Sequence, residues 1–345
     1  MSILQEDCKY IANSNIIDWK KLEGTSILIT GASGLIGSQI VLSLDEHNKK
    51  CSKKIIIYAL VRNVEKAANK FKDCSDSVKI VKGDVCQKIN LSDQVDYIIH
   101  GASVTSSKEF VDYPVETIAT GIDGTRQILE MAKEKQIKGL VYLSSLEVYG
   151  VTDFSLPSVK ENQYGYIEQL SPRSSYSEGK RMIECMCVSY GTEFGVPVKI
   201  ARLAQTFGPG VEYSDNRVFA QFARAAIEKK NIILKTKGET YRNYCYTRDA
   251  VTGILSILLA GENNEAYNIA NDSTGITIYD MAKLVAEKIA HNEIEVKVDI
   301  DKDIEKLGYG PTIKIALNKE KIQKLGWRAE IGLEEMYQRM IEDMN

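Results

Sequence analysis

The sequence predicts an α/β fold in which a doubly wound parallel sheet is joined to a smaller second lobe. Three observations support this prediction: apolar, strand-like runs alternate with helix-like segments, three glycines follow the first run, and the alternation loosens after about residue 205. Alternation of this kind implies parallel strands covered by helices on both faces. The 345 residues suffice for one large domain or for two that share a boundary.

Strands are expected where short apolar runs contain many β-branched residues, and helices where longer segments separate these runs. The expected strands lie at 26–30, 54–61, 78–84, 95–103, 138–145 and 196–204. The expected helices lie at 36–50, 116–136 and 175–195.

The first chemical motif is the stretch ITGASGLIG, which begins inside the first strand. Gly31, Gly34 and Gly37 follow that strand directly and open the next helix. Glycines there permit a tight turn and let a pyrophosphate approach the helix N-terminus, where free N–H groups attract an anion. Glycines that merely close a turn are the alternative. Because the motif starts a βαβ rhythm, we expect a dinucleotide-binding domain of the Rossmann type.

The domain boundaries follow from this motif and from the later change of rhythm. We expect 1–25 to be an N-terminal extension and 26–204 to be the NAD(P)-binding Rossmann domain. Residues 205–345 are expected to form mainly a substrate-binding lobe, with about 241–270 returning to the Rossmann domain.

The end of the second strand bears on which dinucleotide binds. An acidic residue there commonly holds the ribose 2′-hydroxyl of NAD, but here Val61 takes that place and Arg62 follows. The forked guanidinium of arginine suits a 2′-phosphate, so NADP(H) is favoured over NAD(H) unless Arg62 is simply solvated. Asp84, after the third strand, is expected either to accept a hydrogen bond from the adenine amine or to cap a turn.

The second motif places Tyr176 and Lys180 four residues apart on one helix face. A lysine ammonium near an oxidised nicotinamide favours the tyrosine phenolate, which can then act as a base. Ser145, at the tip of the fifth strand, is the candidate that would orient a substrate hydroxyl. A Tyr–Lys pair is often structural, so the prediction depends on its combination with the glycine motif.

Composition excludes several other classes of protein. The net charge is −3 without a basic block, so neither a nucleic-acid nor a membrane surface is expected. The N-terminal residues lack the regions of a signal peptide, and no apolar stretch could span a bilayer, which predicts a cytoplasmic location. The seven cysteines and three histidines show no zinc-site spacing, so no metal is expected.

Several stretches resemble the extended short-chain dehydrogenase/reductases that modify nucleotide sugars. They are ITGASGLIG, GDV, HGAS, SSLEVYG, SSYSEGK, RLAQTFGPG, DNRVFAQF and YRNYCYTRDAV. PRSSYSEGKRMIE and DNRVF are most similar to UDP-glucuronate decarboxylases, with the dTDP-glucose 4,6-dehydratases next. The resemblance implies a nucleoside-diphosphate sugar as substrate. It also implies a homodimer paired through helices at about 115–135 and 176–194.

The resemblance also implies roles for individual residues. Tyr176 would be the catalytic base, Lys180 its partner and a ribose ligand, and Ser145 the group that orients the hydroxyl. The residues implied at the cofactor are Gly31, Ser33, Gly34, Leu35, Ile36, Gly37, Arg62, Asp84, Val85, Ala102, Tyr176 and Lys180. Those implied at the substrate are Ser145, Glu147, Arg173, Gln205, Arg217, Val218 and Arg242.

The pair Leu146-Glu147 distinguishes among the reactions of such enzymes. Dehydratases carry an Asp-Glu pair here, whereas sugar decarboxylases keep the glutamate without the acid because their leaving group is carbon dioxide. Since leucine cannot donate a proton, a decarboxylase or an epimerase that forms a transient 4-keto sugar on bound NAD(P) is expected.

Two alternatives remain open at this point. One is a net NADPH-dependent reductase of a nucleotide-linked keto sugar or ketose, which Arg62 favours. The other is a non-catalytic NAD(P)-binding sensor, against which the intact Tyr176–Lys180 pair argues. Gln205 and Gly121 stand where the similar enzymes commonly have asparagines, so the sugar and the nucleotide stay undetermined.

Overall fold

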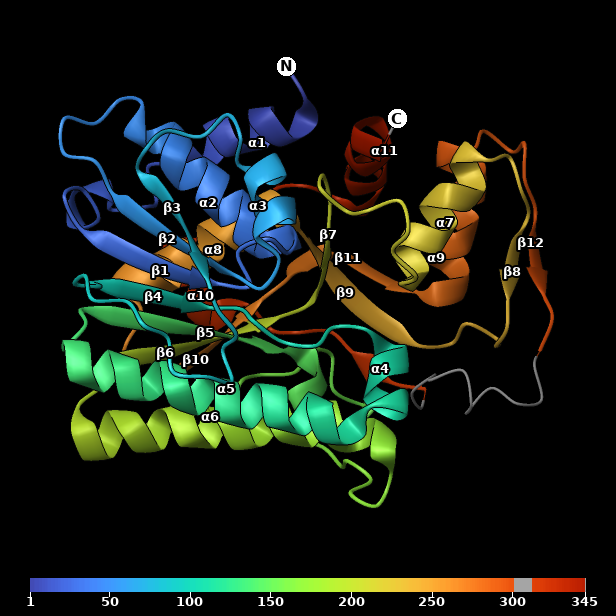
Figure 1. The fold of residues 1–345 in the computed structure, drawn as a ribbon. Helices are drawn as coiled ribbons and strands as arrows, with labels where there is room; N and C mark the ends of the chain where they lie inside the picture. The colour runs from blue at the N-terminus through green and yellow to red at the C-terminus, as the bar shows by residue number, and fades with distance from the viewer. Residues whose placement is uncertain (301–311, 345) are drawn as a thin grey trace.

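A seven-stranded parallel sheet forms the centre of the computed structural model, which describes residues 1–300 and 312–344 (Figure 1). The strands follow the order β3-β2-β1-β4-β5-β6-β10, and every neighbouring pair is parallel. Their bounds are β1 Ser26–Thr30, β2 Ile56–Val61, β3 Val78–Lys82, β4 Tyr97–His100, β5 Gly139–Ser145, β6 Val198–Leu203 and β10 Ala266–Ile269. This order is that of a doubly wound dinucleotide-binding sheet, so the predicted fold class is confirmed.

Helices cover both faces of this sheet. α5 (Pro114–Lys135) and α6 (Ser175–Phe194) pack together on one face, whereas α1 (Ile3–Ala12), α2 (Leu35–Asn48) and α8 (Thr247–Ala260) lie on the other (Figure 1). The shorter helices are η1 Trp19–Lys21, α3 Val64–Lys70, α4 Ser107–Asp112, η2 Leu146–Tyr149, η3 Pro172–Ser174 and α10 Glu320–Gln323.

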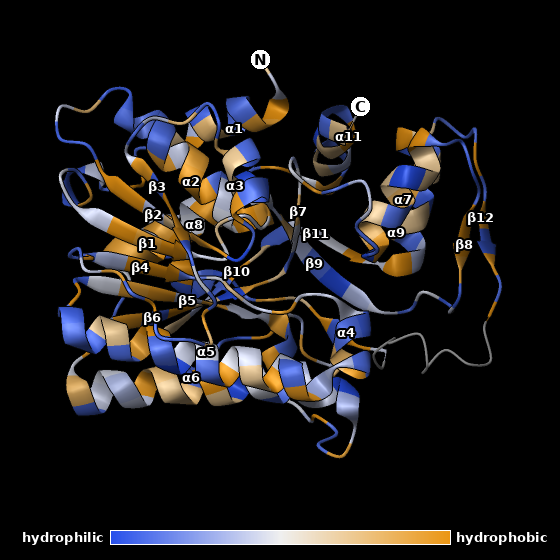
Figure 2. Cartoon of the chain, viewed as in Figure 1, coloured by the Kyte–Doolittle hydropathy of each residue, from blue (hydrophilic) through white to orange (hydrophobic). Residues whose placement is uncertain are grey.

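Alternate residues of the strands face opposite helix layers. Leu28 and Ile98 belong to the cluster that includes residues of α5 and α6, while Ile27, Ile29 and Ile99 belong to the cluster that includes residues of α2 and α8. Figure 2 shows the result as hydrophobic strands between helices of mixed character. Because both faces are buried, the central strands β1, β2 and β4 appear in the sequence as largely apolar runs, whereas the edge strand β3 is partly exposed.

A separate, smaller core fills the second lobe, where Phe207, Phe219, Tyr244 and Tyr337 are almost fully buried. The elements that follow β6 outside the large sheet are β7 Gln205–Phe207, α7 Val218–Ile227, β8 Ile232–Leu234, β9 Tyr241–Tyr246, β11 Asn271–Thr277, α9 Ile278–Leu284, η4 Val285–Ile289, β12 Val296–Val298, β13 Lys314–Ile315 and α11 Leu333–Met344. Strand β10 and helix α8 come from the segment expected to return to the sheet. The lobe boundaries themselves stay a prediction.

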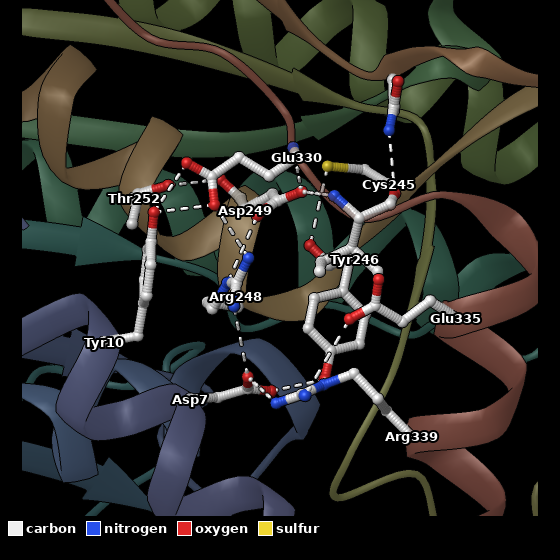
Figure 3. Close-up of polar contacts among 12 residues, drawn as sticks. Asp7, Tyr10, Cys245, Tyr246, Arg248, Asp249, Thr252, Glu330, Glu335 and Arg339 are labelled. Carbon is white, nitrogen blue, oxygen red and sulfur yellow. Dashed lines mark hydrogen bonds and ion pairs between the residues drawn. The ribbon is translucent and has the colours of Figure 1, made fainter.

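The N-terminal extension packs on α2 and α8 and meets the C-terminal helix α11. Asp7 of α1 is fully buried and accepts hydrogen bonds from Arg339 Nη2 at 2.8 Å and from the Tyr246 hydroxyl at 2.6 Å (Figure 3). Arg248 Nη1 lies 4.0 Å from the same carboxylate. A buried carboxylate is costly unless it is paired, so these contacts fix α1 against two distant parts of the chain.

Among the described residues, no helix is both long and apolar enough to cross a membrane. All seven cysteines are free thiols. Cys185 is exposed and Cys187 is buried, as expected for residues two apart on a helix.

Candidate active site

A cleft of about 1430 Å³ opens at the carboxyl ends of the strands and is lined by both lobes. The expected residues that line it are Ser33, Gly34, Leu35, Glu147, Arg173, Gln205, Arg217, Val218 and Arg242. Ile36 packs instead against the core of the sheet. Ligands of open α/β sheets bind at this edge, and here the cleft joins the glycine loop to the residues expected at the substrate.

The glycine loop has the shape that a dinucleotide pyrophosphate requires. Gly31 has a φ of +67°, a left-handed conformation that other residues rarely adopt. A Cβ at Gly37 would lie 2.3 Å from the Gly31 carbonyl oxygen, so only glycine lets α2 start this close to the loop. Gly34 is the N-cap of α2 and has no side chain to bond the free N–H groups. An anion at this helix end would satisfy them.

Two lysines of α3 lie beside this loop and are not among the residues expected from the sequence. Lys70 Nζ donates a hydrogen bond to the Ser33 carbonyl at 3.2 Å, and burial lowers the pKa of Lys70. Lys66 Nζ pairs with Glu212 of the second lobe at 2.5 Å. Both lysines line the cleft. Lys66 and Lys70 are four residues apart on the helix that follows the second strand, and this spacing could have identified them.

The other predicted cofactor residues lie just beyond the ends of the next strands. Val61 is buried at the end of β2 and Arg62 is exposed. Asp84 Oδ1 accepts a hydrogen bond from the Cys86 N–H at 2.9 Å, so this carboxylate caps a turn. Val85 is buried in the core beneath α5. Their contacts with a dinucleotide stay predictions.

His100 positions the loop that carries Ala102. The Thr30 hydroxyl lies 2.7 Å from His100 Nδ1, and His100 Nε2 lies 3.0 Å from the Thr125 hydroxyl. Thr30 Oγ1 also accepts a hydrogen bond from the Ala102 N–H, and Thr125 donates one to the Gly121 carbonyl. Burial lowers the pKa of His100 to about 3, so the ring stays neutral. A neutral ring bonded at both nitrogens holds the loop in place.

Tyr176 and Lys180 face the end of β5 from α6. The buried Lys180 ammonium donates to the Leu143 carbonyl at 2.8 Å and lies 5.6 Å from the centre of the Tyr176 ring. Burial lowers the pKa of Lys180 to about 8. Burial and the Glu147 carboxylate raise the pKa of Tyr176, and a hydrogen bond with Ser145 offsets this only in part. Tyr176 is therefore protonated, and its activation as a base requires further positive charge in the cleft.

Glu147 is held as a carboxylate by two neighbours. The Arg173 guanidinium donates from both terminal nitrogens, at 3.0 and 2.9 Å, and the Ser177 hydroxyl donates at 2.9 Å. Burial alone would raise the pKa of Glu147, but Arg173, Ser177 and the charge of Arg242 together lower it. Glu147 is thus ionised and suited to accept hydrogen bonds.

Leu146 lies at the same turn and borders the cleft, but it packs into the hydrophobic core, with 4% of its surface exposed. Beneath it, the buried Ser144 hydroxyl donates to Glu184 at 2.6 Å, and Glu184 pairs with the buried Arg202 at 2.7 Å. The Ser144–Glu184 hydrogen bond ties the end of β5 to α6, and the Glu184–Arg202 ion pair ties α6 to β6. Of the two serines at the strand end, Ser144 is therefore structural, and Ser145 is the one near Tyr176.

The residues expected on the second lobe line the part of the cleft that this lobe forms. Gln205 begins β7, Val218 begins α7, and Arg217 is the N-cap of α7. Arg217 Nη2 pairs with Asp215 at 2.5 Å. Arg242 Nε is buried and has no hydrogen-bond partner among the described residues. A buried guanidinium N–H in a cleft is a ready donor to an anionic ligand.

A match to a family model decides to which family this site belongs. The model described as the NAD dependent epimerase/dehydratase family matches residues 27–270. The chain belongs to the NAD-dependent epimerase/dehydratase family. The matched residues span the large sheet and include Ser145, Glu147, Tyr176 and Lys180. The resemblance seen in the sequence is confirmed, and the chain is an NAD-dependent enzyme of this type.

Curated relatives in this epimerase/dehydratase family include two named UDP-glucuronic acid decarboxylases. UDP-glucuronic acid decarboxylase 5 of Arabidopsis thaliana is 30% identical over 311 residues, which cover 84% of this chain and 85% of that protein. UDP-glucuronic acid decarboxylase 1 of Xenopus tropicalis is 29% identical over 312 residues, which cover 90% of this chain and 69% of that protein.

Solved structures of similar fold include other family members. UDP-glucose 4-epimerase of Thermotoga maritima, solved with UDP-glucose, has a TM-score of 0.78 and 21% identity, over 92% of this chain and 98% of that one. UDP-glucuronic acid 4-epimerase of Bacillus cereus, solved with NAD, has a TM-score of 0.74 and 20% identity, over 93% and 98%. At this identity the likeness shows the fold.

Besides Lys66 and Lys70, three further residues of this epimerase/dehydratase site were not expected from the sequence. Phe110 stacks on the Tyr176 ring, with 4.2 Å between ring centres and 10° between planes. Ser177 bonds Glu147, and Asp215 pairs with Arg217. Ser177 lies four residues after the predicted Arg173, across the junction of η3 and α6, and both side chains bond Glu147.

Proposed function

We propose that this chain decarboxylates a nucleoside-diphosphate-linked uronic acid through a transient 4-keto sugar, as a UDP-glucuronate decarboxylase does. The observation that supports the proposal is the ionised Glu147 beside Leu146, which is buried in the core. A site with a carboxylate but no acid at the adjacent position suits a leaving group that departs without protonation, and carbon dioxide is such a group. The curated relatives named as UDP-glucuronic acid decarboxylases support the same choice.

In this proposal, Tyr176 and Ser145 act on the sugar 4-hydroxyl. Ser145 holds that hydroxyl and Tyr176 accepts its proton, while the Lys180 ammonium favours the phenolate form. A bound nicotinamide dinucleotide would supply the removal and later return of a hydride. The residues that fit its pyrophosphate are those of the glycine loop, with α2 uncapped by any side chain at Gly34.

The remaining residues act on the keto sugar. The bond between C5 and the carboxylate breaks, its electrons pass to the 4-keto oxygen, and carbon dioxide leaves an enolate. The Tyr176 and Ser145 hydroxyls stabilise this oxygen by hydrogen bonding. C5 of the enolate then takes up a proton from water, which restores the 4-ketone. Because the pKa of Glu147 is lowered, we assign it to accept hydrogen bonds from ring hydroxyls. Arg242, with its unpaired N–H, is assigned to the diphosphate.

The test is to incubate purified protein with NAD⁺ and UDP-glucuronate and to follow released carbon dioxide and the mass of the sugar nucleotide. Loss of one carbon dioxide with formation of a UDP-pentose supports the proposal. Formation of the C4 epimer without carbon dioxide would replace it with an epimerase. A 4-keto-6-deoxy product from dTDP-glucose or UDP-glucose would overturn the interpretation of Leu146. If UDP-glucuronate is inert, the corresponding dTDP-, GDP- and CDP-uronates are tested in the same way.

We also propose that NADP(H) binds at least as tightly as NAD(H). The buried Val61 offers no carboxylate to repel a 2′-phosphate, and the exposed Arg62 follows it directly. Titration of both dinucleotides into the purified protein tests this, with Arg62→Ala as the variant that should selectively weaken NADP(H). A clear preference of the wild type for NAD(H) would show that Arg62 has no such role.

We further propose a homodimer paired through α5 and α6. Val115, Ile118 and Met182 on these helices expose 71%, 41% and 56% of their surfaces. A second copy would cover them, as the resemblance implies. Light scattering should give twice the mass of one chain, and Met182→Glu should lower it to one. A monomeric wild type contradicts the proposal.

A further inference from the structure

A cluster of possible metal ligands lies at the opposite edge of the sheet from the glycine loop. It joins Glu23, which precedes β1, His47, in the last turn of α2, and Cys51, which follows α2. One carboxylate oxygen, one ring nitrogen and the sulfur all lie within 4.8 Å of one another. α2 has 14 residues, so about 20 Å separates the cluster from the active-site end of that helix.

The His47 ring is oriented as metal-binding imidazoles usually are. Its Nδ1 lies 3.0 Å from the Ala12 carbonyl, which can only accept, so Nδ1 carries the proton and Nε2 carries the lone pair. Trp19 stacks on the ring, with 3.8 Å between centres and 12° between planes. The ring orientation is thereby fixed from two sides.

His47 Nε2 has no hydrogen-bond partner among the residues that the structure describes, although only 8% of the residue is exposed. A buried, unpartnered acceptor is rare in folded proteins and is costly. The nearest charged atom is Glu23 Oε1, at 3.6 Å, which is beyond hydrogen-bonding distance. The lone pair therefore points to a position that another group would fill.

Two separations of the ligand atoms match those around a tetrahedral ion, and all three atoms lie within 4.8 Å of one another. Zinc bound to nitrogen or oxygen at about 2.0–2.1 Å and to sulfur at about 2.3 Å holds its ligand atoms roughly 3.3–3.6 Å apart. Here Glu23 Oε1 is 3.6 Å from His47 Nε2 and 3.6 Å from Cys51 Sγ. Glu23 exposes 33% of its side chain, so a water molecule can supply the fourth ligand.

We propose that Glu23, His47 and Cys51 bind one zinc ion that joins the N-terminal extension to the Rossmann domain. A Cys-His-carboxylate set suits zinc better than magnesium or calcium, which prefer oxygen ligands alone. No metal is expected from the sequence, because Glu23 precedes His47 by 24 residues and no zinc spacing results. Since the site lies far from the cleft, the ion serves stability and takes no part in the reaction.

The experiment titrates EDTA-treated, chelator-free protein with Zn²⁺ against a coloured competitor. We expect one ion per chain in the wild type. Cys51→Ala should weaken binding by at least about tenfold, since loss of supporting groups alone commonly costs that much. Cys185→Ala is the matched control, because Cys185 is exposed on α6 and should leave zinc binding unchanged.

A second measurement keeps the test independent of any change in folding. Zn²⁺ should raise the thermal midpoint of the wild type and of Cys185→Ala, but not that of Cys51→Ala or Glu23→Gln. Cobalt should give a thiolate charge-transfer band in the wild type that Cys51→Ala lacks. The proposal is overturned if the wild type binds no stoichiometric zinc, or if Cys51→Ala binds it as tightly as the wild type.

Discussion

Arg173 and Glu147 form a two-bond ion pair on the wall of the cleft, with N–O distances of 3.0 and 2.9 Å. Arg173 is expected to contact the substrate, but in the structure its guanidinium pairs with Glu147 of the protein itself. Arg173 therefore sets the charge of Glu147, and its Nε, which has no partner among the described residues, remains available to a ligand.

Glu147→Gln should lower kcat by about 10²-fold or more on the true substrate, because it removes the charge that orients the sugar. The free energy of unfolding should fall by only about 1 kcal/mol, since the ion pair is partly exposed. Steady-state kinetics and urea unfolding provide the two measurements. Glu178→Gln is the control, because Glu178 lies on α6 and pairs with Arg181. This variant should change kcat and stability little. Full activity in Glu147→Gln would remove Glu147 from the mechanism.

Tyr176→Phe should abolish turnover while leaving dinucleotide affinity within about twofold. The phenylalanine keeps the stacking on Phe110 and loses only the hydroxyl that carries the proton. Product formation and a dinucleotide titration should be measured on the same preparation. Near-normal turnover in this variant is incompatible with Tyr176 as the base.

Arg242→Ala should raise KM for a diphosphate-linked substrate at least tenfold and change dinucleotide affinity little. The reason is that its buried Nε has no partner among the described residues and is available to donate to phosphate. Arg217→Ala should have a smaller effect on KM, because Arg217 is already paired with Asp215. Equal losses for substrate and dinucleotide in Arg242→Ala would place this residue elsewhere in the cleft.

Lys180 should make the stability of the protein depend on alkaline pH. Its folded pKa of about 8 lies below the ordinary 10.5, so the unfolded chain binds more protons between these values and stability rises with pH. Lys180→Met removes this contribution. The wild type should gain roughly 2 kcal/mol relative to the variant between pH 8 and pH 10.

Lys180→Met also loses the hydrogen bond to the Leu143 carbonyl. This loss lowers the stability of the variant by the same amount at both pH values and does not change the slope of stability against pH. Urea unfolding at the two pH values, without added dinucleotide, measures it. Parallel pH profiles for wild type and Lys180→Met would show that Lys180 titrates normally in the folded protein.

The fold was predictable because its signals are local. Most of the first six strands are short apolar runs, and Gly31, directly after β1, has a conformation that few other residues adopt. The Tyr176–Lys180 pair was visible for the same reason, since four residues complete about one helical turn. Signals of this kind can be recognised in a single sequence without a structure.

The partners within the site were not predictable, because they meet only after folding. Glu147 and Arg173 are 26 residues apart, and Lys66 and Glu212 are 146 apart. The contact of Ser144 with Glu184, 40 residues away, likewise follows from how β5 packs against α6. The residue types at some of these positions suggested charged side chains that bind a ligand. Which side chains pair with one another depends on how the strands and helices pack.

The buried carboxylate of Asp7 ties α1 to a segment of the chain that is made much later. Its partner Arg339 lies 332 residues further along the chain, so α1 cannot complete its contacts until the segment that carries Arg339 has been made. Domains generally fold from the N-terminus as they emerge, but the pairing of Asp7 with Arg339 has to wait for α11. A truncated product that ends before α11 would therefore leave the Asp7 carboxylate without the Arg339 guanidinium that pairs with it.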